Sequence, residues 1–235
     1  MTAAGSLWEL LAGFIDLVLP PRCGGCRRVG AWLCEGCRGR IRWLQEPLCR
    51  RCGAEVESAR PDCGCRRRLR SLARLRSAVA YDGPIELAIQ RFKYQGWRRL
   101  AAPLALLLVE RLVVEGLAAS WTVAVPLHRE RLRARGFNQS ELLAAELRAR
   151  MSLERPPGQL VRARATPPQV GHDRLWRQNN VRGAFEWQGP DLEGRSILIV
   201  DDVATTGATL EACAAALRAG GSGSVIGAAV ARVSV

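Results

Sequence analysis

The run ILIVDDVATTGAT, residues 197–209, constrains the fold of this 235-residue chain more than any other feature. Its first residues are apolar and mostly β-branched, which is typical of a strand buried on both faces of a parallel sheet. A helix is predicted from Thr206 to Ala219, before Gly220-Gly221. The loop between the two elements then lies at the carboxyl end of the sheet, where open α/β folds bind ligands.

This loop has the composition of a monophosphate site. Thr205, Thr206 and Thr209 offer hydroxyl donors, and the following helix N-terminus presents unpaired backbone amides to an anion. Gly207 allows the backbone to approach closely or to take a positive φ. We therefore expect a phosphate to be held by Ala204, Thr205, Thr206, Gly207, Ala208 and Thr209.

Two acidic residues, Asp201 and Asp202, end the predicted strand. They would repel a phosphate, but carboxylates accept hydrogen bonds from ribose hydroxyls and help to hold Mg²⁺. The run therefore predicts a pocket for a 5-phosphorylated ribose with Mg²⁺. A plainer alternative is a strand capped by acids before an ordinary threonine-rich helix start. A Walker-type NTPase is disfavoured because the loop lacks the glycine-lysine pair.

Other predicted elements alternate along the chain. Apolar patterning predicts strands near 78–81, 121–127, 160–162 and 225–233, and helices over 84–94, 99–117 and 139–150. The polar segment 163–182 is expected to be a long loop. This order predicts an α/β domain with a parallel sheet and flanking helices.

Eight of the nine cysteines lie in close pairs before residue 66. They form one set of Cys23, Cys26, Cys34 and Cys37, and a second set of Cys49, Cys52, Cys63 and Cys65. Four thiolates at such spacing suit a tetrahedral zinc ion, and with no open position one or two structural zinc ions are expected. Interleaved pairing between the sets stays open, and disulfides are disfavoured because no secretory signal is predicted.

The N-terminal residues 6–19 have the apolar spacing of an amphipathic helix. Their apolar stretch is too short to span a bilayer, so we expect no membrane insertion and a cytoplasmic protein. The formal net charge is +13. Two zinc sites would each add about −2 and leave about +9, so the chain stays basic, which favours a nucleic-acid or polyphosphate partner.

The 197–209 run resembles the phosphoribosyl pyrophosphate motif of the type I phosphoribosyltransferases. Two further patterns, VPL at 125–127 followed by RGFNQ at 135–139 and the spaced polar residues from Arg164 to Phe185, combine with the cysteine pairs to resemble the ComF family. The resemblance covers nearly the whole chain. We expect the amphipathic helix to occupy residues 1–22, and the resemblance implies a double zinc ribbon over 23–70 and a phosphoribosyltransferase-like domain over 71–235.

The resemblance also implies roles for individual residues. It assigns Asp201 and Asp202 to the ribose hydroxyls and the loop 204–209 to the 5-phosphate. Type I enzymes displace pyrophosphate, and cationic side chains must meet the leaving charge. The turn expected after Leu127 is placed like the pyrophosphate loop of the family, and it is followed by Arg129, Arg131, Arg133 and Arg135. Of these, Arg135 is favoured because it lies in the RGFNQ run, although a solvated basic loop is the plainer alternative.

Lys93 is the only lysine in the chain, and we expect it to approach the acceptor or the pyrophosphate. The segment 163–182 is in the position of the flexible loop that closes over the substrate in type I enzymes. An ordinary surface loop is the alternative reading of that segment.

Two functional hypotheses follow. The first is an enzyme that transfers phosphoribose to or from an acceptor that the sequence does not identify. The second is a non-catalytic single-stranded-DNA-binding factor that works with other DNA-uptake proteins in natural transformation and uses the pocket for sensing. Its DNA contacts would be Trp32 and Trp43, which can stack on bases, and the basic residues Arg66, Arg67, Arg68 and Arg70.

Overall fold

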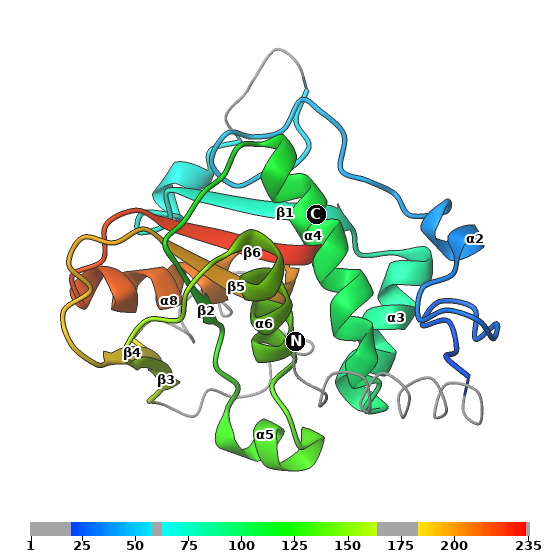
Figure 1. Ribbon diagram of the computed structural model, residues 1–235. Helices are drawn as coiled ribbons and strands as arrows, with labels where there is room; N and C mark the ends of the chain where they lie inside the picture. Colours follow the sequence, from blue (N-terminus) through cyan, green and yellow to red (C-terminus); the bar gives the residue numbers. More distant parts are fainter. Residues whose placement is uncertain (1–19, 58–62, 164–182, 234–235) are drawn as a thin grey trace, which may run out of the picture.

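Parallel strands form the centre of the structure. The computed structural model describes residues 20–57, 63–163 and 183–233. The main sheet contains β1 (Arg74–Ala80), β2 (Trp121–Ala124), β5 (Ile197–Ala204) and β6 (Val225–Arg232), in the order β1-β6-β5-β2. All three neighbouring pairs are parallel, and Ile199 lies opposite Val123 on one side and Gly227 on the other (Figure 1). The prediction of an α/β fold with a parallel sheet is confirmed.

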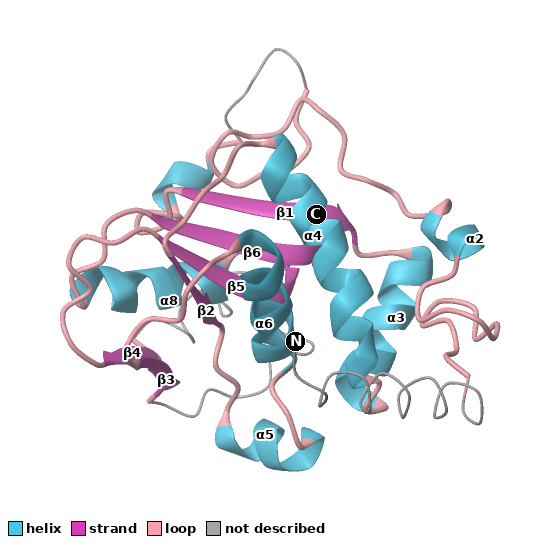
Figure 2. Ribbon diagram, viewed as in Figure 1, coloured by secondary structure: helices cyan, strands magenta, loops and turns pink. Residues whose placement is uncertain are grey.

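Helices cover both faces of this sheet. One face carries α3 (Gly83–Tyr94), α4 (Ala101–Val114) and α6 (Gln139–Met151), and the other carries α8 (Ala208–Ala219) and the hairpin of β3 (Gln159–Arg162) and β4 (Phe185–Gln188). Successive side chains of β5 point to opposite faces of the sheet, so the apolar strand contributes to both cores. Leu198 and Val200 pack with α4 and α6, whereas Ile197 and Ile199 pack with α8. Figure 2 shows α4 and α6 in front of the strands.

The cysteine-rich segment runs along the outer edge of β1. Leu44 donates its N–H to the carbonyl of Ala78 (3.3 Å), and Ala80 donates to the carbonyl of Arg42 (2.8 Å). These bonds cover backbone groups that an edge strand would otherwise expose. Residues before this crossing pack with the α4 core, and residues after it pack with the α8 core. The segment therefore places one half on each face of the sheet.

Some elements differ from those that the sequence predicted. α5 (Arg129–Arg135) forms where a turn was expected after Leu127, and β4 was not predicted. The helix expected over 99–117 is divided into the 3₁₀ turn η2 (Arg98–Leu100) and α4. Two other short elements are α2 (Glu35–Arg38) and η1 (Cys65–Arg67). The helix expected over 6–19 and nearly all of the loop expected over 163–182 lie outside the described residues.

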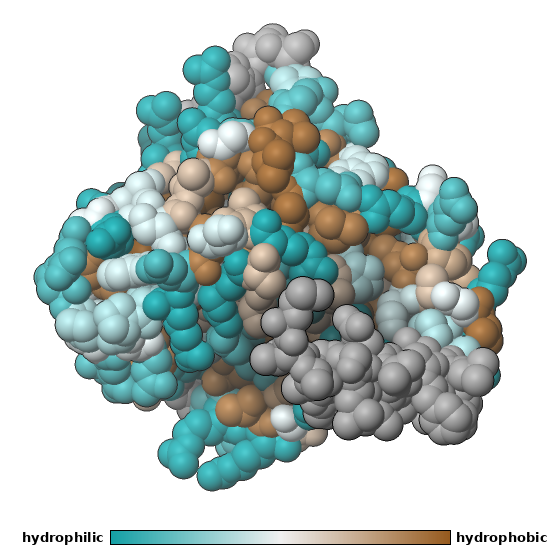
Figure 3. Space-filling model, viewed as in Figure 1, coloured by the Kyte–Doolittle hydropathy of each residue, from teal (hydrophilic) through white to brown (hydrophobic). Residues whose placement is uncertain are grey.

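On the face drawn in Figure 3, hydrophilic side chains surround several hydrophobic patches, and one of these lies over the C-terminal end of α4. Val113 and Val114 are 64% and 81% exposed there. Within the described ranges, no helix combines the length and the apolar character that crossing a bilayer requires.

Candidate functional site

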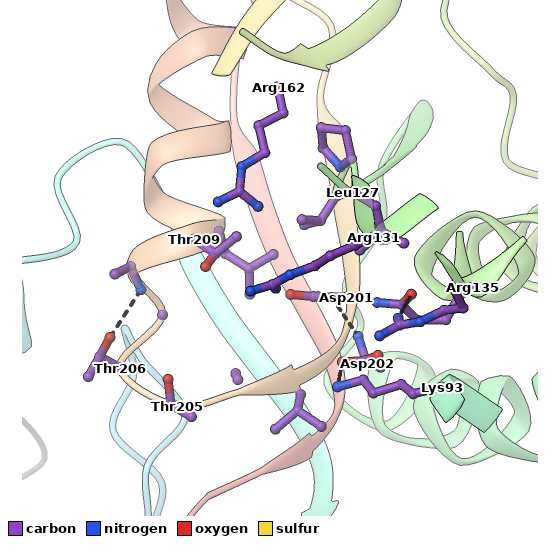
Figure 4. A pocket seen from close by; sticks show the side chains of 18 of the residues that line it. Lys93, Leu127, Arg131, Arg135, Arg162, Asp201, Asp202, Thr205, Thr206 and Thr209 are labelled. Atoms are coloured by element: carbon purple, nitrogen blue, oxygen red, sulfur yellow. Dashed lines mark hydrogen bonds and ion pairs between the residues drawn. The ribbon is translucent and has the colours of Figure 1, made fainter. Parts of the chain in front are cut away.

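The loop between β5 and α8 forms one wall of a pocket of about 250 Å³. All six residues expected to hold the phosphate, 204–209, line this pocket (Figure 4). Gly207 takes the left-handed conformation with φ of 80° and immediately precedes the first turn of α8. The hydroxyl of Thr206 accepts a hydrogen bond from the N–H of Ala208 (3.3 Å), which stabilises the turn. Ala208, Thr209 and Leu210 of the first turn also line the pocket, so the start of α8 borders it, as an anion site at a helix N-terminus requires.

Asp201 and Asp202 both line the pocket at the end of β5. Asp201 Oδ1 accepts hydrogen bonds from the hydroxyl of Ser140 and from the N–H of Asp202, each at 2.9 Å. Asp202 is only 2% exposed, and its buried Oδ2 has no hydrogen-bond partner among the described residues. A buried carboxylate oxygen without a hydrogen-bond donor suits a ligand hydroxyl or a cation.

Buried charges lie beside the two acids. Burial, and then the neighbouring charge of Asp202, raise the pKa of Asp201 to about 7. Lys93 faces Asp202 from the last turn of α3, with its Nζ 2.7 Å from Asp202 Oδ1. Burial alone would lower the pKa of Lys93, but the charge of Asp202 and their hydrogen bond outweigh it, so the pKa is raised. The structure therefore keeps Lys93 charged inside the pocket wall.

Arg135 also lines the pocket, at the end of α5. Its guanidinium donates a hydrogen bond to the side chain of Gln139 and lies 5.2 Å from the ring centroid of Tyr94. Tyr94 is 75% exposed. An exposed aromatic ring and a fixed cation thus stand at the same edge of the pocket.

The RGFNQS segment, residues 135–140, joins the end of α5 to the start of α6. Gly136 ends α5 with φ of 76°, and Asn138 then begins α6. The side chain of Asn138 donates to the carbonyl of Val125 (3.0 Å) and accepts from the N–H of Ser140 (3.0 Å). This cap joins the segment after β2 to α6 and presents the Ser140 hydroxyl to Asp201.

Two arginines complete the pocket. Arg162 was not predicted from the sequence, and among the arginines after Leu127 the prediction favoured Arg135 over Arg131. Arg131 extends from α5 and Arg162 from the end of β3, and Figure 4 shows both guanidinium groups reaching toward Thr209. Burial, and then the charge of Arg131, lower the pKa of Arg162. A ligand phosphate between them would relieve this repulsion.

The pocket residues fit a ligand that carries both a sugar and negative charge. Four cationic side chains and two carboxylates line it: Lys93, Arg131, Arg135, Arg162, Asp201 and Asp202. The adjacent carboxylates and the unpartnered Oδ2 of Asp202 are hard oxygen donors of the kind that Mg²⁺ accepts in phosphate-binding sites.

The cysteines form the two expected sets. Within each set the four sulfur atoms lie within 4.8 Å of one another, which excludes the interleaved pairing. Sulfur–sulfur distances include 3.6 Å for Cys26 and Cys34 and 3.7 Å for Cys49 and Cys65. A tetrahedral ion with Zn–S bonds of about 2.3 Å needs sulfur separations of ~3.8 Å. Both sets therefore fit structural zinc.

The residues expected to contact DNA do not lie together. Trp32 and Trp43 pack against the core of the α4 face, whereas Leu69, within the Arg66–Arg70 segment, belongs to the core of the α8 face. Trp43 also pairs with Val79 at the edge of β1. The sheet thus separates the two groups, because the cysteine-rich segment crosses from one face to the other.

Comparison with known families gives two matches. The double zinc ribbon domain family matches residues 14–68, and the phosphoribosyl transferase domain family matches residues 150–234. The first match contains both cysteine sets, and the second contains β5, the loop and α8.

Several relatives align with most of the chain. The DNA utilization protein YhgH of Escherichia coli O157:H7 is 31% identical over 223 residues, which cover 89% of this chain and 96% of the relative. Competence protein F of Haemophilus influenzae is 31% identical, over 79% of this chain and 84% of the relative. Competence protein ComFC of Bacillus subtilis is 26% identical, over 79% of this chain and 77% of the relative.

Proposed function

The chain belongs to the ComF family, in which a double zinc ribbon precedes a phosphoribosyltransferase domain, and we propose that its pocket binds phosphoribosyl pyrophosphate or ribose 5-phosphate with Mg²⁺. One observation carries the proposal: the 204–209 loop, two carboxylates and four cations converge on a single pocket of about 250 Å³. The phosphate is assigned to the loop and the start of α8, and the ribose hydroxyls to Asp201 and Asp202. Zinc is assigned a structural role in both cysteine sets.

The same arrangement supports a type I phosphoribosyltransferase reaction with an unidentified acceptor. In that reaction the bond between the anomeric carbon and the pyrophosphate oxygen breaks, and pyrophosphate leaves with the electron pair. The acceptor forms the new bond to the anomeric carbon and loses its proton. Arg135 and Arg131 are assigned to the negative charge of the leaving group, and bound Mg²⁺ would share that task.

We expected Lys93 to approach the acceptor or the pyrophosphate, and we assign it a second role beside that one. Its ion pair with Asp202 supports the proposal that it holds this buried carboxylate in place for the ribose. Tyr94, exposed beside the pocket, offers a face on which an acceptor base can stack.

Calorimetry with phosphoribosyl pyrophosphate and Mg²⁺ tests the proposal. We expect binding by the wild type and at least a tenfold loss of affinity in the Asp201→Asn plus Asp202→Asn variant, because two charged acceptors are lost. Glu146→Gln, an acid on α6 that pairs with Arg150 outside the pocket, is the matched control. Equal affinity in wild type and double variant would overturn the proposal. Asp201→Asn alone, which keeps the Lys93–Asp202 pair, replaces the double variant if that variant does not fold.

A second candidate function is binding of single-stranded nucleic acid in DNA uptake, with the protein acting in the cytoplasm. The names of the relatives, DNA utilization protein and competence protein, favour it. A row of aromatic and basic side chains from the first cysteine set to the pocket also favours it. Trp32 contacts Trp97 (6.2 Å between ring centroids), and Arg98, the next residue in the sequence, is exposed. At the pocket, Arg135 lies over the ring of Tyr94. Bases stack on such rings while cations meet the backbone.

Fluorescence anisotropy with labelled oligothymidine separates the two candidates. The second predicts salt-dependent binding that weakens at least severalfold in Tyr94→Ala, since base stacking on an aromatic ring is worth about 1–3 kcal/mol. An unchanged affinity in Tyr94→Ala, or no binding by the wild type at low salt, would remove this row as a nucleic-acid surface.

A further inference from the structure

Glu211 joins the candidate phosphate site to the zinc-ribbon segment. It lies in the first turn of α8, two residues after Thr209. Its carboxylate accepts three successive backbone N–H bonds, from Arg70 (2.8 Å), Ser71 (2.7 Å) and Leu72 (3.0 Å). Bonds from N–H groups to a carboxylate are among the stronger hydrogen bonds in proteins. The start of α8 is therefore tied to the chain that leaves the second cysteine set.

The loop itself rests on the same chain. A Cβ atom placed on Gly207 would lie 2.8 Å from Leu75 Cδ2 and 3.3 Å from Leu69 Cδ2. Leu69 and Leu75 are 1% and 0% exposed. In so close a packing, movement of either leucine is transmitted to the loop backbone.

The second cysteine set holds this chain at both ends. Leu69 donates its N–H to the carbonyl of Cys65 (3.0 Å). Arg51, between Cys49 and Cys52, donates its Nε to the carbonyl of Leu69 (2.6 Å) and accepts at its own carbonyl from Leu75 (2.7 Å).

The two cysteine sets differ in what they pack against. Cys49, Cys52 and Cys65 share one hydrophobic cluster with Leu69, Leu72, Leu75, Ala204 and Leu210. The first set lies beside α3 instead, where Arg91 donates to the carbonyls of Gly24 and Gly25. Figure 1 shows this first set, in dark blue with α2, next to α3 and away from α8.

We propose that the second zinc ribbon, acting through Glu211, Leu69 and Leu75, positions the phosphate loop, so that zinc at Cys49, Cys52, Cys63 and Cys65 and the phosphorylated ligand stabilise each other's binding. Glu211 is a positioning residue in this scheme. The inference rests on the proposed ligand of the pocket. Coupling of this kind is reciprocal: if zinc tightens ligand binding, the ligand tightens zinc binding by the same factor.

Matched cysteine variants test the proposal in the full chain. Cys63 and Cys26 are the exposed members of their sets, so Cys63→Ser and Cys26→Ser disturb the two sites comparably. Native mass spectrometry should show the loss of one zinc ion in each. We expect the Kd for ribose 5-phosphate to rise about 5–150-fold in Cys63→Ser, the usual range of allosteric coupling, and to stay within about twofold in Cys26→Ser.

Zinc release gives a readout that does not depend on activity. With a chromophoric chelator, ribose 5-phosphate should slow the release of one of two zinc ions from the wild type. Glu211→Gln keeps all cysteines and replaces Cys63→Ser if that variant does not fold. It should still hold two zinc ions but bind ribose 5-phosphate several-fold more weakly. Ribose 5-phosphate should then no longer slow the release of one zinc ion to the chelator. Unchanged ligand affinity in the folded second-site variant would overturn the inference but not the proposed function. Failure of the wild type to bind ribose 5-phosphate would overturn both.

Discussion

Lys93 and Asp202 form an ion pair across the wall of the pocket, with 2.7 Å between Nζ and Oδ1. The pair joins the last turn of α3 to the end of β5, 109 positions apart in the sequence. The side chain of Asp202 is 3% exposed and that of Lys93 is 19% exposed. A buried carboxylate requires a compensating charge, so the single lysine has a structural task besides any contact with ligand.

Lys93→Met should destabilise the fold by about 3 kcal/mol, because it leaves the charge of Asp202 buried without a partner. The measurement is the free energy of unfolding in urea. The double variant Lys93→Met plus Asp202→Asn removes both charges and should recover part of the loss. A double variant that is as unstable as the sum of both single variants would show that the pair has no energetic coupling.

Asp201 should make stability depend on pH in the absence of ligand and metal. Its pKa is raised to about 7 in the folded protein, from an ordinary value near 3.8, so the folded state favours the protonated form. The resulting stability is fully present below the unfolded pKa and is lost as the pH rises toward 7. Asp201→Asn mimics the protonated form, so its Tm relative to wild type should rise between pH 5 and pH 8.

Thermal unfolding of both proteins at several pH values measures this difference. Glu146→Gln removes an acid outside the pocket and should run parallel to wild type. A constant difference between Asp201→Asn and wild type across this pH range would contradict the raised pKa.

The elements of the site that depend on contiguous residues were predictable from sequence. β5, the 204–209 loop and α8 follow from one thirteen-residue run, since apolar pattern, glycine and threonines all act locally. The cysteine pairs followed from spacing, because thiolates separated by one or two residues reach the same metal ion. Which pairs share an ion needed the structure, since the spacing left interleaved pairing open.

Contacts between distant segments were not predictable. The single sequence does not reveal that Ser140 reaches Asp201, or that Glu211 binds a segment about 140 positions earlier, because polar residues at a helix start have many possible partners. Arg162 was missed for a similar reason: only pairing with β4 fixes which way the end of β3 points. α5 replaced the expected turn because its sequence, RERLRAR, consists entirely of residues with high helix propensity.

Gly207→Ala should both destabilise the protein and weaken ligand binding. Alanine at φ of 80° is strained, and its Cβ would lie 2.8 Å from Leu75. Gly96, with φ of 71° and no heavy atom within 4 Å of an added Cβ, gives the control. Gly96→Ala should cost only the backbone strain, about 1–2 kcal/mol, whereas Gly207→Ala should cost at least 1 kcal/mol more because of the clash. Similar unfolding free energies for the two variants would show that the leucines give way freely.

Arg162→Gln should weaken binding of ribose 5-phosphate far more than loss of a surface charge does. Arg162 reaches toward Thr209 from β3 while Arg131 approaches from α5, so a phosphate at the loop would meet both guanidinium groups (Figure 4). A hydrogen bond to a charged group is worth about 1.5–3 kcal/mol, which corresponds to roughly a tenfold to hundredfold higher Kd by calorimetry. Arg162→Lys should recover only part of this, because an ammonium lacks the planar fork of donors.

Arg155→Gln is the matched control, since Arg155 is 63% exposed and lies outside this pocket. It should change the Kd by less than about twofold, as expected for loss of one screened surface charge. Ribose without a phosphate identifies the contact: if Arg162 binds the 5-phosphate, its loss should not alter the weak affinity for ribose. The contrary outcome is that Arg162→Gln and Arg155→Gln bind ribose 5-phosphate equally well, while Arg162→Gln loses affinity for phosphoribosyl pyrophosphate. Arg162 would then contact the pyrophosphate, and its assignment to the 5-phosphate would be wrong.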